Sequence, residues 1–151
     1  MAASASALLG WAVERRVAAQ VETDARERLT RLVGHLAASG SPLESRHMAF
    51  MGRLADARIF VLDTRREVLA SSVSEGELSA WRPLLKGLPL QSPVAEASVQ
   101  EHALGAEGHL VASRGVGGMA GPVLVAAAVS RRRLEEAQQA AAGPVRVLVL
   151  L

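Results

Sequence analysis

Apolar residues recur every three or four positions between Trp11 and Ala38, which is the spacing of an amphipathic α-helix. This segment contains no proline, and its only glycine is Gly34. It therefore predicts a single helix of roughly 25 residues, about 37 Å long at about 1.5 Å per residue. The apolar stripe consists of Val13, Val17, Val21, Ala25, Leu29, Leu32 and Leu36.

This stripe is narrow and close to a heptad repeat, as in helices that pack against another helix. We therefore expect a homodimer formed through the helix, in addition to contacts with the helix's own domain. The alternative is that the stripe only covers the domain's own sheet. The residues expected at the dimer interface are Val13, Val17, Val21, Leu29 and Leu32.

A second helix is predicted to begin at the sequence Ser41-Pro42-Leu43-Glu44. Serine suits the N-cap, proline the first helical position, and a glutamate three residues after the serine closes a capping box. This helix should end near Ala55. The periodicity then changes to that of strands, because the compact apolar runs 58–62 and 67–71 flank the tight connection 63–66 and predict a β-hairpin.

The rest of the chain predicts further strands and two more helices. The run 122–129 is apolar throughout, which is typical of a strand in the middle of a sheet with both faces covered. Gly143-Pro144 should break the last helix. The remaining predicted elements are a helix from Ser74 to about Lys86, strands over 94–103 and 109–114, and a helix over 130–142.

This order of elements predicts an α+β fold, with a long N-terminal helix and a five-stranded, mainly antiparallel sheet that has helices on one side. The chain has 151 residues, of which 50% are hydrophobic and 21% are charged, so we expect one folded domain over residues 13–142. The apolar ends, 1–12 and 143–151, are each too short to cross a bilayer.

Composition and charge exclude several kinds of function. The chain has no cysteine, which excludes disulfides, thiolate metal sites and cysteine nucleophiles. The formal net charge is only +2. The densest basic run, Arg131-Arg132-Arg133, is followed at once by Glu135 and Glu136, so we expect no nucleic-acid partner.

We also expect no enzyme activity and no cofactor. The glycine-rich segment 115–121 lacks the lysine of a P-loop and precedes a strand, not a helix. His102 and His109 flank a predicted turn, where Glu101 and Glu107 could help them to hold a metal ion, but surface histidines without a metal are favoured.

Three residues are candidates for binding a small molecule. Trp81-Arg82 places a large aromatic side chain beside a cation on a helix that should cover the sheet. Packing of Trp81 against the sheet is the alternative to a role in a pocket. Arg114, in a predicted strand, is a candidate for contacting an anionic ligand.

Two segments carry a family resemblance. The predicted hairpin, which consists of residues 57–63, a short turn and residues 67–72, resembles the opening hairpin of extracytoplasmic PAS-like (Cache-type) sensor domains. The end of the chain consists of the segment 121–130, the segment 131–142 and an apolar tail. In this order, these parts are similar to the last strand, the exit helix and the second membrane span of bacterial sensor histidine kinases. The family usually has glycine in the first hairpin turn, where this chain has Arg65-Arg66.

The resemblance implies a sensor domain in the cell membrane, exposed outside the cytoplasm and joined at both ends to membrane spans. Residues 1–12 would then be the remnant of the first span or a disordered start, and 143–151 the beginning of the second span or a tail. The domain would transmit ligand or membrane state to a cytoplasmic kinase. Arg15 and Arg16 oppose this topology, because basic residues beside a span favour the cytoplasmic side.

Two other functions stay open. A cytosolic, dimeric partner-binding module of the roadblock type has the same order of strands and helices after residue 41, although the long first helix would be extra. A small enzyme with an unrecognised site is the third interpretation, and no motif in the sequence favours it.

Overall fold

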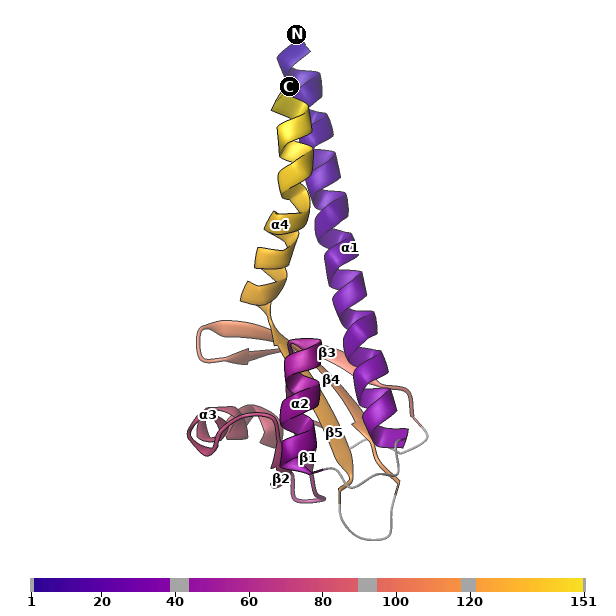
Figure 1. Ribbon diagram of the computed structural model, residues 1–151, viewed down its shortest axis with the longest axis vertical. Helices are drawn as coiled ribbons and strands as arrows, with labels where there is room; N and C mark the ends of the chain where they lie inside the picture. Colours follow the sequence, from indigo (N-terminus) through magenta and orange to yellow (C-terminus); the bar gives the residue numbers. More distant parts are fainter. Residues whose placement is uncertain (1, 39–43, 90–94, 118–121, 151) are drawn as a thin grey trace.

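The computed structural model describes residues 2–38, 44–89, 95–117 and 122–150 (Figure 1). Its five strands form one open antiparallel sheet in the order β2-β1-β5-β4-β3. This confirms the predicted α+β class, and the apolar strand β5 lies in the middle of the sheet, as expected. The elements are α1 (Ala2–Ala38), α2 (Ser45–Ala55), β1 (Arg58–Leu62), β2 (Val68–Ser71), α3 (Glu75–Lys86), β3 (Ser98–Leu104), β4 (Glu107–Gly115), β5 (Leu124–Ser130) and α4 (Arg131–Leu150).

The helices pack on both faces of the sheet, which differs from the expected arrangement on one side. Strand residues alternate between the two faces. On one face, Ile59 and Val61 contact a core built from α1, α2 and Leu134 of α4. On the other face, Phe60 and Leu62 contact α3 through its buried apolar residues. The sheet therefore lies between two hydrophobic cores, one shared with α1 and α2 and the other shared with α3.

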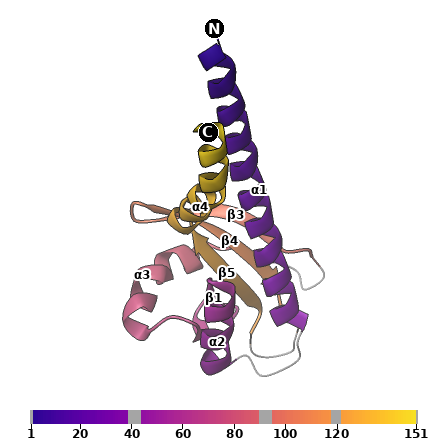
Figure 2. The ribbon, with the colours of Figure 1, turned by 45° about the horizontal axis from the view of Figure 1, so that its top comes forward.

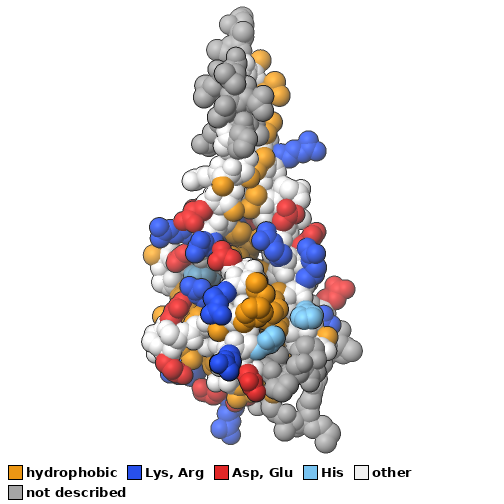
Figure 3. Space-filling view, in the orientation of Figure 1, with side chains coloured by type: hydrophobic (Ala, Val, Ile, Leu, Met, Phe, Trp, Pro, Cys, Tyr) orange, Lys and Arg blue, Asp and Glu red, His pale blue; other side chains and the backbone are white. Residues whose placement is uncertain are grey.

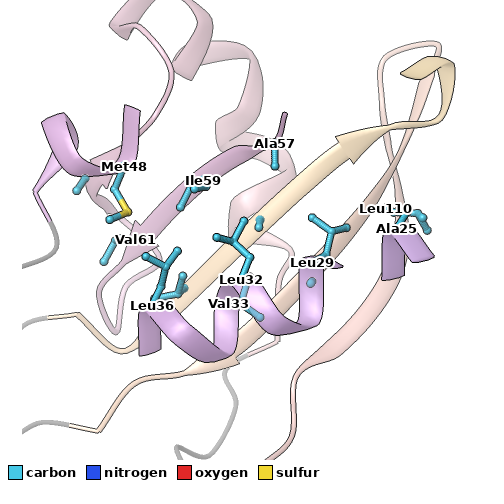
Figure 4. Close-up of a cluster of buried hydrophobic side chains, with 14 of the residues drawn as sticks. Ala25, Leu29, Leu32, Val33, Leu36, Met48, Ala57, Ile59, Val61 and Leu110 are labelled. Carbon is cyan, nitrogen blue, oxygen red and sulfur yellow. The ribbon is translucent and has the colours of Figure 1, made fainter. Parts of the chain in front are cut away.

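The long helix α1 supplies much of the first core. Figure 4 shows Leu29, Leu32, Val33 and Leu36 on one side of α1, facing the strands. Leu36 is 1% exposed and Val33 is fully buried. α1 begins at Ala2, so the apolar segment expected to be a span remnant or a disordered start forms the first turns of this helix.

The second helix begins later than predicted. α2 starts at Ser45, and Glu44 before it has an extended backbone, with φ −90° and ψ 148°. Glu44 therefore occupies the N-cap instead of the third helical position. The predicted cap at Ser41-Pro42 lies outside the described residues. In contrast, α3 begins where it was predicted, and Ser74 caps it, because Ser74 Oγ accepts a hydrogen bond from the Glu77 amide at 3.4 Å.

The predicted hairpin is present, with β1 antiparallel to β2. In its turn Arg66 adopts φ 60°, the left-handed conformation that favours glycine. Arg66 Nε donates a hydrogen bond to the Leu88 carbonyl at 2.6 Å, and its amide donates to the Asp63 carbonyl at 3.0 Å. These contacts hold an arginine where the resembling family usually has glycine.

The last helix is longer than predicted. α4 continues from Arg131 to Leu150, through Gly143-Pro144, where a break was expected. Proline removes one main-chain hydrogen bond and strains the preceding turn. However, α4 runs beside α1, and this pairing supports the helix beyond the proline (Figures 1 and 2). Both terminal helices therefore run away from the sheet on the same side of the domain.

Candidate ligand cavity

A cavity of about 600 Å³ lies where the α3 face of the sheet meets the first turns of α4. Trp81 of α3, His109 of β4 and Ala128 of β5 contribute to its wall. Arg132, Arg133 and the nearby Glu136 border it from α4. The start of α4 is thus part of the cavity itself.

His109 is the most buried ionisable residue of this wall. It is 5% exposed, and none of the residues that the structure describes is a hydrogen-bond partner of its Nδ1. Its ring lies edge-on to the indole of Trp81, with 4.7 Å between the centroids, and Trp81 in turn lies 5.1 Å from Phe60. Burial lowers the pKa of His109 below its ordinary value of 6.5, although nearby Glu107 opposes this shift. The imidazole is therefore neutral at pH 7.

Three arginines of the cavity are each paired with a carboxylate. Arg58 Nε lies 3.0 Å from Glu77 Oε1, Arg132 Nε 3.5 Å from Glu136 Oε1, and Arg133 Nη2 3.9 Å from Asp56 Oδ1. All six side chains are at least two-fifths exposed, so each pair stabilises the fold only slightly. Basic and acidic side chains are also interspersed on the face of the molecule that Figure 3 shows.

Arg131 joins three elements beside the cavity. Its guanidinium group forms ion pairs with Glu22 of α1, at 3.1 Å, and with Glu101 of β3. These contacts lower the pKa of Glu22 below its ordinary value of 4.5, the hydrogen bond from Arg131 being the largest cause and that from Arg26 the next. Glycine at position 108 leaves room for the Arg131 side chain, because a Cβ there would lie 3.3 Å from Arg131 Cγ.

The structure separates the three predicted ligand-binding residues. Trp81 packs against the sheet and also lines the cavity, so its role in binding a ligand stays a prediction. Arg82 is exposed on α3 and is not among the lining residues. Arg114 lies on the opposite face of the sheet, where its Nη1 would be 3.2 Å from a Cβ at Gly34 of α1. Arg114 therefore supports the packing of α1 and does not reach the cavity.

The five residues predicted at the dimer interface also divide into two groups. Leu29 and Leu32 are 4% and 9% exposed in the core of their own domain, and Val21 packs against this core. They face the sheet, which is the alternative that the sequence left open. Val13 and Val17, nearer the N-terminus, are half-buried.

His102 and His109 flank the β3–β4 turn, as predicted, and are direct partners across this hairpin. His102 Nε2 is also buried, and it has no hydrogen-bond partner in the described part of the chain. Among the residues that the structure describes, no group of three or more histidine, aspartate or glutamate side chains is placed to hold a metal ion.

Sequence reasoning missed Arg131, Arg132 and Arg133 as site residues. It considered them as a basic run that could bind nucleic acid, and it interpreted His109 as a surface histidine. The alternation along β4 places His109 on the same face as Val111, which could have signalled its burial. The contacts of Arg131 with Glu22 and Glu101 depend on long-range packing and leave no local signal.

No protein-family model matches the chain, and no curated protein matches it. No helix in the described part of the chain combines the length and apolar character of a candidate membrane span.

Proposed function

We propose that this chain is the extracytoplasmic sensor domain of a membrane-bound two-component histidine kinase, and that the domain is not itself an enzyme. One observation carries the proposal: the first turns of α4 form part of the cavity wall, and α4 then runs beside α1 away from the sheet. A ligand in the cavity would therefore contact the element that leaves the domain. The family resemblance of the hairpin and of the exit segment supports this interpretation.

Transmission needs a direct connection between the cavity and α4. β5 ends at Ser130 and α4 begins at Arg131, so no flexible linker separates sheet and helix. Ser130 Oγ also accepts a hydrogen bond from the Arg133 amide at 3.2 Å, which caps the helix. Ligand binding would favour one of two positions of α4 relative to α1, and a homodimer through α1 would carry this shift toward the membrane.

The order of elements keeps the roadblock-type module as a second candidate. From α2 onward the chain runs helix, two strands, helix, three strands, helix. The two functions differ in location, because a roadblock-type module would lie in the cytosol and bind a partner protein.

Labelling of the natural full-length protein in intact cells separates these functions. Thr64 is exposed in the β1–β2 turn, and the chain has no cysteine, so Thr64→Cys gives this domain a unique thiol. We expect a membrane-impermeant maleimide to label it in intact cells, and the gene to encode apolar spans of about 20 residues on both sides. Labelling only after lysis, or the absence of such spans, would overturn the sensor proposal in favour of a cytosolic module.

A further inference from the structure

His109 lies directly opposite the residue that precedes α4. It is the cross-strand partner of Ser130, the last residue of β5, and both residues line the cavity. Directly opposite residues of an antiparallel pair have Cβ atoms about 4.5–5.5 Å apart, on the same face of the sheet. Ser130 Oγ in turn accepts the hydrogen bond from the Arg133 amide that caps α4. The imidazole of His109 therefore lies beside the N-terminus of this helix.

This environment suits only the neutral form of the imidazole. The ring of His109 is 5% exposed and lies edge-on to Trp81, and its Nδ1 has no hydrogen-bond partner among the described residues. A protonated imidazole carries a donor on both nitrogens, and a buried charge without partners or water is costly. The N-terminus of α4 raises this cost, because a helix N-terminus carries a partial positive charge. Protonation of His109 therefore favours a state in which water reaches the ring.

The charged groups that face His109 differ in sign between the two sides of the cavity. They are Arg132, Arg133 and Glu136 on α4, Asp56, Arg58, Glu77 and Glu107 on the other elements, and the titratable His102 across the β3–β4 pair. α4 therefore contributes a net positive charge, whereas the other elements contribute a net negative charge while His102 is neutral. A positive charge on His109 is thus attracted toward the sheet and α3 and is repelled by α4.

The first turn of α4 is the part of this wall that is most easily displaced. The side chains of Arg132 and Arg133 are 80% and 61% exposed, whereas the apolar residues of α3 are buried. On the opposite face of the sheet, Leu134 is buried in the other core and Arg131 forms an ion pair with Glu22 of α1. The pKa of Glu22 lies below 4.5, so this pair persists in mild acid. The first turn can therefore tilt while α4 stays attached to α1.

We propose that acid is a signal for this domain, and that protonation of His109 tilts the first turn of α4 away from the sheet and shifts α4 relative to α1. The proton binds more tightly in the state in which water reaches the imidazole, so acid increases the population of that state. Burial lowers the pKa of His109 in the closed state below 6.5, so the closed state prevails at pH 7 and the shift occurs below pH 6.5. That the shift is a signal rests on the proposed function, whereas the shift itself needs no kinase.

A distance measurement on the purified chain tests the shift. Ala19 on α1 and Ala141 on α4 are both exposed, and the cysteine-free chain accepts spin labels at Ala19→Cys and Ala141→Cys only. We expect the distance distribution between the labels to change as the pH is lowered from about 8 to about 5, with the same midpoint as the NMR titration of the His109 ring. A distribution that does not change, or that changes with a different midpoint, would overturn the proposal.

A histidine variant tests the residue. His109→Phe keeps a ring beside Trp81 but cannot be protonated, so we expect the distance distribution of this variant to be the same at pH 8 and pH 5. His47→Gln is the control, because His47 is exposed on α2 outside the cavity, and the change should persist in it. A change that persisted in His109→Phe, or that disappeared in His47→Gln, would contradict the assignment to His109.

A pair of variants at Ser130 tests the same coupling without altering His109. Aspartate and asparagine cap helices as well as serine does, but only Ser130→Asp places a carboxylate opposite the imidazole. We expect the midpoint of the change in Ser130→Asp to lie about one pH unit above that in Ser130→Asn. Equal midpoints would overturn the proposal even if His109→Phe failed to fold.

The acid response and the proposed function can fail separately. A chain whose Thr64→Cys thiol is labelled in intact cells, but whose α1–α4 distances do not depend on pH, would be a sensor domain without the acid response proposed for it. A chain labelled only after lysis, whose distances change through His109, would keep the acid response and lose the extracytoplasmic function.

Discussion

Arg131 Nη1 donates a hydrogen bond of 3.1 Å to Glu22 Oε2, joining the first residue of α4 to the middle of α1. The same guanidinium group also contacts Glu101 on the edge strand β3. Arg131 and Glu22 are only about three-tenths exposed, so solvent screens this contact less than it screens the pairs around the cavity. One side chain thus holds the two terminal helices and the sheet together.

We expect Arg131→Ala to lower the free energy of unfolding by about 1–2 kcal/mol, because Glu22 loses its main ion-pair partner. Urea unfolding followed by circular dichroism measures this loss. Arg132→Ala is the matched control, since Arg132 is 80% exposed and should change stability by less than about 0.5 kcal/mol. Equal effects of the two variants would show that the Arg131 contacts contribute no more than a surface pair.

The stability of the fold should decrease in acid because of His109. Its pKa is lower in the folded chain than its ordinary value of 6.5, so the unfolded chain binds the proton more readily. The stabilisation is complete above pH 6.5 and is lost as the pH falls from there through the folded pKa. Thermal unfolding at a series of pH values checks this, and His109→Phe should remove the decrease in this range.

A second decrease is expected at lower pH. The pKa of Glu22 is below its ordinary value of 4.5, so its contribution is present above pH 4.5 and disappears below it. Arg131→Ala should weaken this second decrease but leave the one due to His109 unchanged. If a single variant abolished both decreases, the assignment to two separate groups would be wrong.

The predicted dimer can be tested with residues of α1 that are not buried in the core of the domain. Val13 and Val17 are half-buried on α1, and Val13→Glu with Val17→Glu should give a monomer in sedimentation experiments if α1 pairs with its copy. Leu29→Ala is the contrasting variant. It should lower the free energy of unfolding by about 2–5 kcal/mol, because Leu29 is buried in the sheet core. If the variant with both glutamates stayed dimeric, the assignment of Val13 and Val17 to the dimer interface would be wrong.

Two helical glycines should respond to alanine in opposite directions. A Cβ at Gly52 would lie 2.8 Å from the Ala57 carbonyl oxygen and 2.9 Å from Ser72 Cβ, so Gly52→Ala should destabilise the fold by about 1–3 kcal/mol. A Cβ at Gly76 of α3 meets no atom within 4 Å, so Gly76→Ala should stabilise it by about 0.5–1 kcal/mol. Differential scanning calorimetry of both variants checks the sign. A neutral Gly52→Ala would show that α2 can move away from β1 at little cost.

The sequence was sufficient to predict the fold class because each signal was local. The period of the apolar residues located α1, the change of period located the β1–β2 hairpin, and the helix predicted from Ser74 corresponds to α3. Two predictions failed where packing outweighs local preference. Gly143-Pro144 does not end α4, which has α1 beside it, and α3 covers the face of the sheet opposite α1.

The cavity could be predicted only in part. Trp81 was a candidate because aromatic side chains beside a cation are rare in this chain, and it does line the cavity. Arg114 and Arg82 were candidates by charge alone, and charge does not reveal which face of a sheet or helix a residue occupies. His109 and Arg133 come together only after β4 and α4 meet, across a sequence separation that no local pattern spans.

The direct passage from Ser130 to Arg131 gives α4 a fixed rotation as well as a fixed position. Each residue of an α-helix turns the chain by about 100°, so the sheet determines which side of α4 faces α1 at every later position. A twist of β5 by a few degrees would rotate the whole helix by the same angle, with no loop to absorb it. The outward end of α4 can therefore report the state of the sheet as an angle, even where its axis does not move.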